Sequence, residues 1–555
     1  MFGAGGGTSS YREVEETDVI FLWGANAREN HPIFFHHVLK AIRRGGKLFV
    51  VDPRRTPSAE WADQWLGINV GTDIVLAHGM AREIIHQGLA NDAFIRRATE
   101  GFDAYRECVE KYTLEYAERE TGVPAEVIRQ AAEAFARADR AMICWTLGIT
   151  EHHNAVDNVL ALINLSLLTG HVGKYGSGVN PLRGQNNVQG GGDMGAIPNR
   201  LAGFQDWTKD PAVKAKFDRA WGIDMAPRYG KNLSEMFEAM DHGELKAVYA
   251  IGENPALSEA DQTRAERLLV GLDHLVVQDI FMTETAWLAD VVLPASAWPE
   301  KTGTVSNTDR MVQLGRRALE LPGEARLDLW IVQQMARRLG LDWRYDGDDA
   351  GVAAVYEEMR LAMHEAIGGI GWSRLQKEGS VTYPCRDDAD PGQPIVFIDR
   401  FATADGRLRL VPADIVPAAE RPDATFPFVL ITGRQLEHWH TGSMSRRARV
   451  LDALEPMATA SLHGDDLHAL GLAPGDVATV RSRRGEVCLH VRRDDGTPRG
   501  AVFIPFVYAE AAANLMTHAA LDPVAKIPEF KYCAVAVTAG GTLRPSAGYG
   551  TGSPV

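Results

Sequence analysis

Cysteine is scarce in this chain and is never closely spaced. Five cysteines occur among 555 residues: Cys108, Cys144, Cys385, Cys488 and Cys533. An odd number of distant thiols without a Cys-x-x-Cys pair argues against a disulfide framework, a structural zinc site and a cysteine-held iron-sulfur cluster. The paired histidines at 36–37 and 152–153 would diverge on regular elements, so we predict no metal site built from side chains of this sequence.

Long hydrophobic runs and a basic surface are also missing. No apolar stretch approaches the roughly 20 residues that a membrane helix needs, and the first residues lack the basic and apolar regions of an export signal. We therefore expect a cytoplasmic protein without a membrane segment. The formal net charge of −15, with no basic stripe among the aromatic residues, argues against nucleic acid as a partner.

Glycine and side-chain amides are concentrated at residues 182–195, which read Leu-Arg-Gly-Gln-Asn-Asn-Val-Gln-Gly-Gly-Gly-Asp-Met-Gly. An ordinary surface loop also contains glycine and asparagine, but it seldom holds this many uncharged amides. The glycines let a ligand approach the backbone, the amides donate and accept hydrogen bonds, and Arg183 offers a planar fork for a carboxylate or phosphate. The segment therefore predicts a binding site.

The first half of the chain contains a repeated pattern. An apolar run at 18–23 ends in Gly24-Ala-Asn, and the next run ends in Asp52; a run at 247–251 ends in Gly252-Glu-Asn, and the next ends in Asp279. The glycine-to-aspartate spacings, 28 and 27 residues, nearly match. In doubly wound sheets such a turn and its helix receive a phosphate, and the acid accepts from sugar or base donors. Two nucleotide-sized sites are predicted.

Two alternatives remain open for these turns. Buried parallel strands followed by glycine also occur in α/β proteins that bind nothing, and Asp52 could be a solvated turn residue. An NAD-binding dehydrogenase is a weaker rival, because neither turn has the Gly-x-Gly-x-x-Gly fingerprint of a nicotinamide dinucleotide site.

The predicted fold class is α/β, with two doubly wound nucleotide-binding-like domains followed by a C-terminal β-barrel domain. We expect helices at 125–138, 157–168, 327–339 and 352–367, and barrel strands within 397–411, 477–491 and 501–505. The expected boundaries are 1–185 for the first domain, 186–345 for the second, 346–394 for a linker or insertion, 395–545 for the barrel and 546–555 for a tail.

Several motifs together resemble the molybdopterin oxidoreductase family, and within it the catalytic α subunits of formate dehydrogenases. They are Arg183-Gly-Gln-Asn-Asn-Val-Gln, Glu29-Asn-His-Pro, Asp52-Pro-Arg-Arg, Gly252-Glu-Asn-Pro, Gln278-Asp-Ile-Phe-Met-Thr-Glu-Thr-Ala, His438-Trp-His-Thr-Gly-Ser-Met and Lys526-Ile-Pro-Glu-Phe-Lys-Tyr. The resemblance covers nearly the whole chain. It implies formate as substrate and a bis-molybdopterin guanine dinucleotide cofactor with molybdenum or tungsten.

The resemblance also assigns site residues. For one dinucleotide it implies Asn26, Glu29, Asn30, Asp52, Arg54, Gly71 and Asp73. For the other it implies Gly252, Glu253, Asn254, Gln278, Asp279 and Asp290. Leu147 to Glu151 would line the pterin cavity, and Arg434, His438, His440, Asn514 and Lys531 would cap the pterins.

Arg183 matches the arginine that lies beside the metal in this family, and Gln185 matches the amide two residues further on. A bidentate arginine would hold the formate carboxylate so that its C–H bond faces the metal centre.

The resemblance implies a longer parent protein. In the family, an iron-sulfur domain and a cysteine or selenocysteine metal ligand precede the segment that resembles Met1-Phe-Gly-Ala-Gly. We therefore expect this sequence to be a carboxyl-terminal portion that is inactive alone, and a selenocysteine codon read as a stop would explain its start. Iron-sulfur and flavin electron-transfer subunits are the implied partners. A nitrate reductase and a non-catalytic cofactor-binding subunit are the alternatives.

Overall fold

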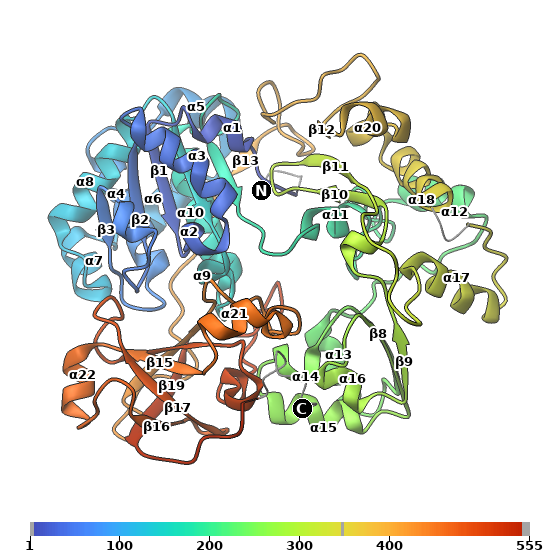
Figure 1. The fold of residues 1–555 in the computed structure, drawn as a ribbon. Helices are drawn as coiled ribbons and strands as arrows, with labels where there is room; N and C mark the ends of the chain where they lie inside the picture. Colours follow the sequence, from blue (N-terminus) through green and yellow to red (C-terminus); the bar gives the residue numbers. More distant parts are fainter. Residues whose placement is uncertain (1–4, 346–348, 547–555) are drawn as a thin grey trace.

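The computed structural model describes residues 5–345 and 349–546 of the chain. Residues 547–555 of the expected tail lie outside the described residues. Figure 1 shows four parts: a first α/β unit in blue to cyan, a barrel in orange to red, and a second α/β unit and a mixed unit that share the intermediate colours from teal to brown. The first unit lies above the barrel in this view.

The first unit is built on a five-stranded parallel sheet in the order β3-β2-β1-β5-β6. Its strands are β1 (Val19–Trp23), β2 (Lys47–Val51), β3 (Gln64–Leu66), β5 (Ala141–Trp145) and β6 (Gly178–Pro181). The chain winds outward from β1 in both directions, so the sheet is doubly wound and its switch point lies between β1 and β5.

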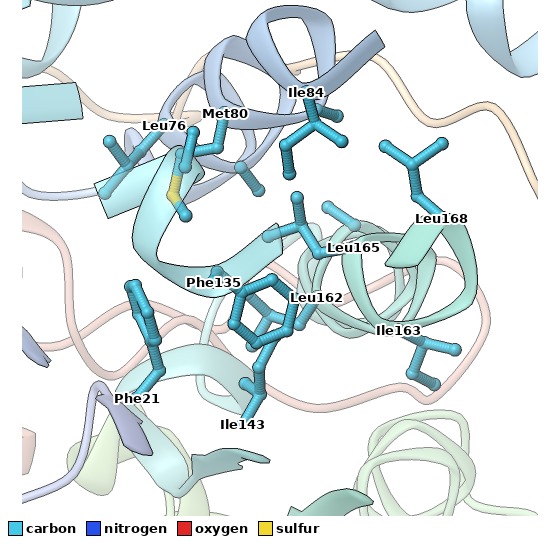
Figure 2. Close-up of a cluster of buried hydrophobic side chains, with 14 of the residues drawn as sticks. Phe21, Leu76, Met80, Ile84, Phe135, Ile143, Leu162, Ile163, Leu165 and Leu168 are labelled. Atoms are coloured by element: carbon cyan, nitrogen blue, oxygen red, sulfur yellow. The ribbon is translucent and has the colours of Figure 1, made fainter. Parts of the chain in front are cut away.

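Helices cover both faces of this sheet because β1 carries apolar side chains on each. Ile20 and Leu22 pack toward α3 (Pro32–Arg43). Phe21 packs on the other face against α4 (Asp73–His86), α8 (Ala125–Arg137) and α10 (Ala155–Thr169), as Figure 2 shows. The remaining helices are α1 (Tyr11–Val14), α2 (Ala27–Asn30), η1 (Ala59–Trp61), α5 (Asp92–Ala98), α6 (Phe102–Val109), α7 (Leu114–Thr121) and α9 (Leu147–Thr150).

The second unit has a three-stranded parallel sheet in the order β7-β8-β9. Its strands are β7 (Ala247–Ile251), β8 (His274–Asp279) and β9 (Val291–Pro294). Its helices are α13 (Leu233–Asp241), α14 (Pro255–Ser258), α15 (Gln262–Val270), α16 (Glu284–Leu288), η2 (Trp298–Glu300) and α17 (Asp328–Arg338). The strands follow one another in a single direction, so this smaller sheet has no reversal of strand order.

Residues 346–394 were expected to be a linker or insertion. Of these, residues 346–348 lie outside the described residues, and residues 349–385 contribute to a folded unit that the expected boundaries divide between domains. Tyr356, Ile367 and Leu375 share one apolar core with Phe217 and Val312. This mixed unit contains α11 (Val188–Asp193), α12 (Pro211–Trp221), β10 (Gly303–Ser306), β11 (Met311–Gly315), α18 (Asp349–Ala362), α19 (His364–Ile367), α20 (Trp372–Glu378) and β12 (Ser380–Thr382). The acidic, glycine-rich composition of the segment concealed the apolar side chains that place it here.

A closed six-stranded barrel ends the fold, which confirms the predicted α/β class with a C-terminal barrel. The second α/β unit was expected to be doubly wound, but its three strands run in sequence order without a reversal. Its strands are β14 (Phe428–Gly433), β15 (Thr459–Leu462), β16 (Val477–Arg481), β17 (Glu486–Arg493), β18 (Ala501–Pro505) and β19 (Cys533–Ala539). Its helices are η3 (Ser445–Arg447), α21 (Arg449–Leu454), α22 (Gly464–Ala469), η4 (Ala509–Ala511) and η5 (Ala513–Leu515).

The predicted strands at 397–411 lie outside the barrel, which begins at Phe428. Only β13 (Leu408–Arg409) forms there, and it pairs with β4 (Thr99–Glu100) of the first unit. Leu408 and Leu410 are buried in the core of that unit, so burial, and not the turn at 405–406, decides where this segment lies.

Candidate functional site

The two predicted glycine turns have the same local geometry. Gly24 follows β1 with φ +55° and donates its N–H to Val51 O at 2.8 Å; Gly252 follows β7 with φ +64° and donates to Gln278 O at 2.8 Å. Two residues later, Asn26 and Asn254 are the N-cap residues of α2 and α14, each a helix of four residues. The positive φ explains why glycine is needed at both turns. The repeat in the sequence is therefore a repeat in structure.

The repeat continues at the opposite edge of each sheet. Asp63 accepts the N–H of Leu48 at 2.8 Å, and Asp290 accepts the N–H of Leu275 at 2.7 Å. Asp290 therefore corresponds to Asp63 and joins the amino ends of β8 and β9. The structure does not bring Asp290 together with Gly252 and Asp279, which lie at the carboxyl ends of the strands.

At the switch point of the first sheet, two backbone turns touch through glycine. A Cβ on Gly24 would lie 2.9 Å from the backbone of Gly148, and a Cβ on Gly148 would lie 2.6 Å from Gly24. The N–H of Gly148 and the hydroxyl of Thr146 both donate to Gly24 O, at 3.2 and 2.5 Å. This contact joins the loops after β1 and β5 where ligands bind in doubly wound sheets.

A cleft of about 950 Å³, including its open mouth, lies between this edge of the first unit and the barrel. It contains nine of the predicted residues: Asn26, Asn30, Asp52, Arg54, Gly71, Asp73, Leu147, Arg434 and Lys531. The sequence therefore predicted residues from four separate loops of the first unit and two of the barrel that the fold brings to one cleft.

The floor of the cleft is acidic. Burial raises the pKa of Asp52 to about 6, although the N–H and charge of Arg54 oppose this rise. Burial also raises the pKa of Asp73, which accepts a hydrogen bond from Trp23 Nε1 at 2.8 Å. Glu29 lies beside the floor, accepts from Asn26 Nδ2 at 2.6 Å, and has a pKa raised by burial. These carboxyls are suited to accept from ribose or base donors.

The barrel side of the cleft is basic. Lys531 pairs with Glu151 at 2.7 Å, and Arg434 donates to His440 Nε2 at 2.7 Å. Burial and the positive charges of Arg434 and Lys531 lower the pKa of His440 to about 3, so the imidazole is neutral. Arg54 lies 3.5 Å from the centroid of the Phe503 ring. Three cations around one cleft suit an anionic ligand such as a diphosphate.

Arg183 lies beside this cleft, between Leu182 and Gly184, which line it. Its Nε donates to Gln189 Oε1 at 2.7 Å, and its carbonyl lies 2.8 Å from His31 Nε2. Among the described residues, its two terminal nitrogens have no hydrogen-bond partner. Gln185, two residues further on, is exposed. The guanidinium of Arg183 is thus held through Nε, while its two terminal nitrogens are available to a ligand.

The second turn carries acidic groups. Burial and the charge of Asp279 raise the pKa of Glu253, and burial with the charge of Glu253 raises that of Glu259 to about 7. Asn254 accepts from Thr285, and Gln278 donates to Asp328, so both amides support the turn itself. Glu253 is exposed and Glu259 and Asp279 are partly buried, so these carboxyls can accept from donors of a base or sugar.

Two predicted barrel residues have structural partners. Asn514 donates to the carbonyls of Leu257 and Ser258 at 3.2 and 2.9 Å, which ties the barrel to the second unit. His438 is buried within the barrel, with Nε2 2.8 Å from Glu455 O. The structure places neither side chain in the cleft.

Sequence reasoning did not single out His31, Thr146 or Glu259, and it named Gly148 only within the range 147–151 that the resemblance implies. Gly148 gave one signal, because it follows the apolar run 141–145 just as Gly24 follows β1. His31 and Thr146 gave none, since their positions depend on how the two turns meet.

Buried polar atoms in the cleft test whether a pterin dinucleotide would fit. Four of them lack a protein partner: His31 Nδ1, Arg54 Nε, Thr56 Oγ1 and Arg434 Nε. Buried polar groups are nearly always hydrogen-bonded, so these atoms indicate a polar ligand. The carboxyls of the cleft can accept from the donors of a guanine or ribose, and its cations can bind a diphosphate. The residues of the cleft therefore fit a pterin guanine dinucleotide.

Two family models match the chain. The model for molybdopterin oxidoreductase matches residues 4–338, and the model for the molybdopterin dinucleotide binding domain matches residues 428–534. The chain therefore belongs to the molybdopterin oxidoreductase family. The two matched domains are of the kinds that bind a molybdopterin cofactor, and the chain is an enzyme of the molybdopterin oxidoreductase family.

Relatives of known name align with almost the whole chain. The α subunit of the F420-dependent formate dehydrogenase of Methanocaldococcus jannaschii is 41% identical over 97% of this chain and 78% of its own length. Formate dehydrogenase H of Escherichia coli is 36% identical over 96% and 74%. Acetylene hydratase from Pelobacter acetylenicus shares the fold, with a TM-score of 0.77 at 23% identity, covering 97% of this chain and 80% of its own.

No helix among residues 5–345 and 349–546 has the length and apolar composition to cross a membrane. Within the same ranges, no group of three or more histidine, cysteine or acidic side chains is arranged to hold a metal ion.

Proposed function

We propose that this chain is the catalytic portion of a molybdenum- or tungsten-dependent formate dehydrogenase, which oxidises formate to carbon dioxide with a bis-molybdopterin guanine dinucleotide cofactor. The observation that carries the proposal is the position of Arg183. Its Nε is held by Gln189 and its terminal nitrogens are open, directly beside a cleft whose residues fit a pterin dinucleotide. The names of the two formate dehydrogenases among the relatives support formate as the substrate.

The first dinucleotide would lie in the cleft between the first unit and the barrel. The N–H groups of the turn after β1 and the cations Arg54, Arg434 and Lys531 would hold the diphosphate. Asp52 would accept from ribose or guanine donors, and those hydrogen bonds would lower its raised pKa.

The second dinucleotide would lie at the turn after β7. Gly252 has open space where a Cβ would be, so a ligand can approach its backbone closely. Glu253 and Asp279 would accept from the guanine or ribose. The matching hydrogen bonds of Gly24 and Gly252 support two similar halves of one paired cofactor.

Arg183 would bind both oxygens of the formate carboxylate through its open edge. This pairing fixes the direction of the C–H bond and removes water from the carboxylate. Formate loses two electrons and one proton as it becomes carbon dioxide. When bound, the metal-pterin group supplies the two-electron redox chemistry. The electrons would then pass to partner subunits, an inference supported by relatives named as α subunits.

Replacing Arg183 with lysine tests the proposal, because lysine keeps the charge and loses the fork. In the metal-loaded enzyme, we expect kcat/KM for formate-dependent dye reduction to fall roughly 100-fold with pterin content unchanged. Arg219→Lys, on the exposed face of α12, is the matched control and should retain full activity. Full formate turnover by Arg183→Lys, or reduction of nitrate by an enzyme that ignores formate, would contradict the proposal.

A further inference from the structure

Arg183 is connected through Gln189 to two further buried polar side chains, Asp193 and Tyr383, which the function proposed above does not use. Gln189 accepts from Arg183 Nε at 2.7 Å, and its amide nitrogen donates to Asp193 Oδ1 at 2.9 Å and to the Tyr383 hydroxyl at 3.0 Å. Tyr383 in turn donates to Asp193 Oδ2 at 2.9 Å. The three side chains form a closed triangle, with exposed fractions of 1, 4 and 7%.

The polarity of this triangle fixes the orientation of Arg183. An ionised carboxylate only accepts hydrogen bonds, so Asp193 requires the amide nitrogen of Gln189 to face it. The amide oxygen must then face Arg183. Because the guanidinium is planar, a partner at Nε fixes the plane of the whole fork and leaves the edge with the two terminal nitrogens for a ligand.

Tyr383 brings the mixed unit into contact with the site. Its backbone N–H donates to Arg310 O at 3.0 Å, and its carbonyl accepts from Arg310 Nη1. Its ring lies in the same apolar core as Ile367 and Leu375. The position of this hydroxyl is therefore set by the segment that sequence analysis interpreted as a linker or insertion.

We propose that Gln189, Asp193 and Tyr383 are positioning residues that hold the Arg183 fork in the orientation required by the formate carboxylate. The inference rests on the proposed function and deepens it. Only Arg183 touches the substrate, and the other three act through it. A weakened triangle lets the amide of Gln189 rotate and the fork turn away from the carboxylate.

The first test removes one hydroxyl. In the metal-loaded enzyme, Tyr383→Phe should lower kcat/KM for formate about 10-fold, through a rise in KM larger than any fall in kcat. The rise in KM is expected because Arg183 contacts formate already in the bound complex. Asp193→Asn should act in the same direction, since its amide no longer dictates which way Gln189 faces. Pterin content should match the unmodified enzyme in both variants.

Tyr356→Phe is the matched control. Tyr356 belongs to the same apolar core, is 3% exposed, and donates its hydroxyl to Ile370 O at 2.7 Å without touching the triangle. Its loss removes one buried hydrogen bond, whereas Tyr383→Phe removes the bond to Asp193 and the one accepted from Gln189. We expect a loss of thermal stability in Tyr356→Phe but no change in KM.

A double-mutant cycle separates positioning from general damage. With lysine at position 183, the fork is already gone, so adding Tyr383→Phe should change KM little. Crystal structures give a readout independent of activity: the contact of 2.7 Å between Arg183 and Gln189 should be lost or divided between two conformers in Tyr383→Phe.

The outcomes distinguish the two proposals. If the unmodified enzyme does not oxidise formate, the proposed function fails. If it does, and Arg183→Lys is impaired while Tyr383→Phe and Asp193→Asn have the KM of Tyr356→Phe, only the inference about positioning is overturned. Additive effects in the cycle, or an unmoved Arg183 in the crystal structures, overturn it as well.

Discussion

At the scale of single residues, glycine does the most at this site, because two glycines allow two loops to touch. Gly24 and Gly148 belong to loops that follow different strands, and their backbones meet where side chains would otherwise separate them. The contact holds both turns at the edge of the cleft, which Gly24 and Gly148 both line.

We expect Gly148→Ala to damage this contact. The added Cβ would lie 2.6 Å from Gly24, which forces the two loops apart at a cost of about 1–3 kcal/mol. The midpoint of thermal unfolding should fall, and the purified protein should retain less pterin. Gly303→Ala is the control, because a Cβ there has no neighbour within 4 Å. Normal pterin content in Gly148→Ala would show that the contact is not needed for binding.

The structure brings together residues that the sequence singled out by residue type, by spacing or by the family resemblance. Arg183, Asp52 and Arg54 were predicted from motifs, and the fold brings them to or beside one cleft. His31 could not be predicted, because its role depends on a carbonyl 152 residues away.

At the scale of elements, the two α/β units share one arrangement of strands, turns and helices. Strand, glycine turn, short helix and second strand recur with the same hydrogen bonds at both sheet edges. The two units differ in size, since the first sheet has five strands and the second has three. The resemblance assigned Asp290 to the cofactor. Because Asp290 makes the same hydrogen bond as Asp63 of the first unit, its geometry is that of a residue that joins two strands.

Asp290→Ala tests that interpretation. Loss of the hydrogen bond to Leu275 N–H should lower the free energy of unfolding by about 1 kcal/mol, because water can replace part of this half-exposed contact. Hydrogen exchange of the Leu275 amide should become faster, while pterin content stays normal. Asp273→Ala, an exposed neighbour, should change neither quantity. If Asp290→Ala lost pterin while hydrogen exchange of the Leu275 amide stayed unchanged, Asp290 would be a cofactor-binding residue and this interpretation would be wrong.

At the scale of the whole molecule, titratable groups join the first unit to the barrel. Glu529 of the barrel is buried, with Oε1 at 2.7 Å from His153 Nδ1 and at 3.5 Å from His152 Nδ1. Burial raises the pKa of Glu529, but its contacts with both histidines outweigh burial and lower the pKa to about 2. The hydrogen bond to Glu529 raises the pKa of His153 above 6.5.

These shifts predict how stability depends on pH. The lowered pKa of Glu529 contributes stability above pH 4.5, which is lost as the pH falls toward 2. The raised pKa of His153 contributes stability below pH 6.5, which is lost as the pH rises through its folded value. The contact between the first unit and the barrel should therefore be strongest between about pH 4.5 and 6.5.

Glu529→Gln checks this prediction. Thermal unfolding across the pH range should show the largest loss of stability, relative to the unmodified protein, between pH 4.5 and 6.5. Glu60→Gln, an exposed substitution in the first unit, should leave the profile unchanged. A loss that is uniform with pH would mean that Glu529 acts by packing and not by its charge.

The sequence by itself determined what is local: the strands at 19–23 and 247–251, the glycine turns after them, and the hairpin at 477–491. The strands follow from apolar runs, the turns from the backbone freedom of glycine, and the hairpin from alternating side chains, and each of these patterns can be seen in the order of residues. The tertiary structure alone decided what depends on distant partners. It placed residues 349–385 in a shared core, moved 408–409 to the first unit, and connected Tyr383 to Arg183 through Gln189. Burial of apolar surface selects those neighbours, and no local pattern records which distant surface a segment will cover.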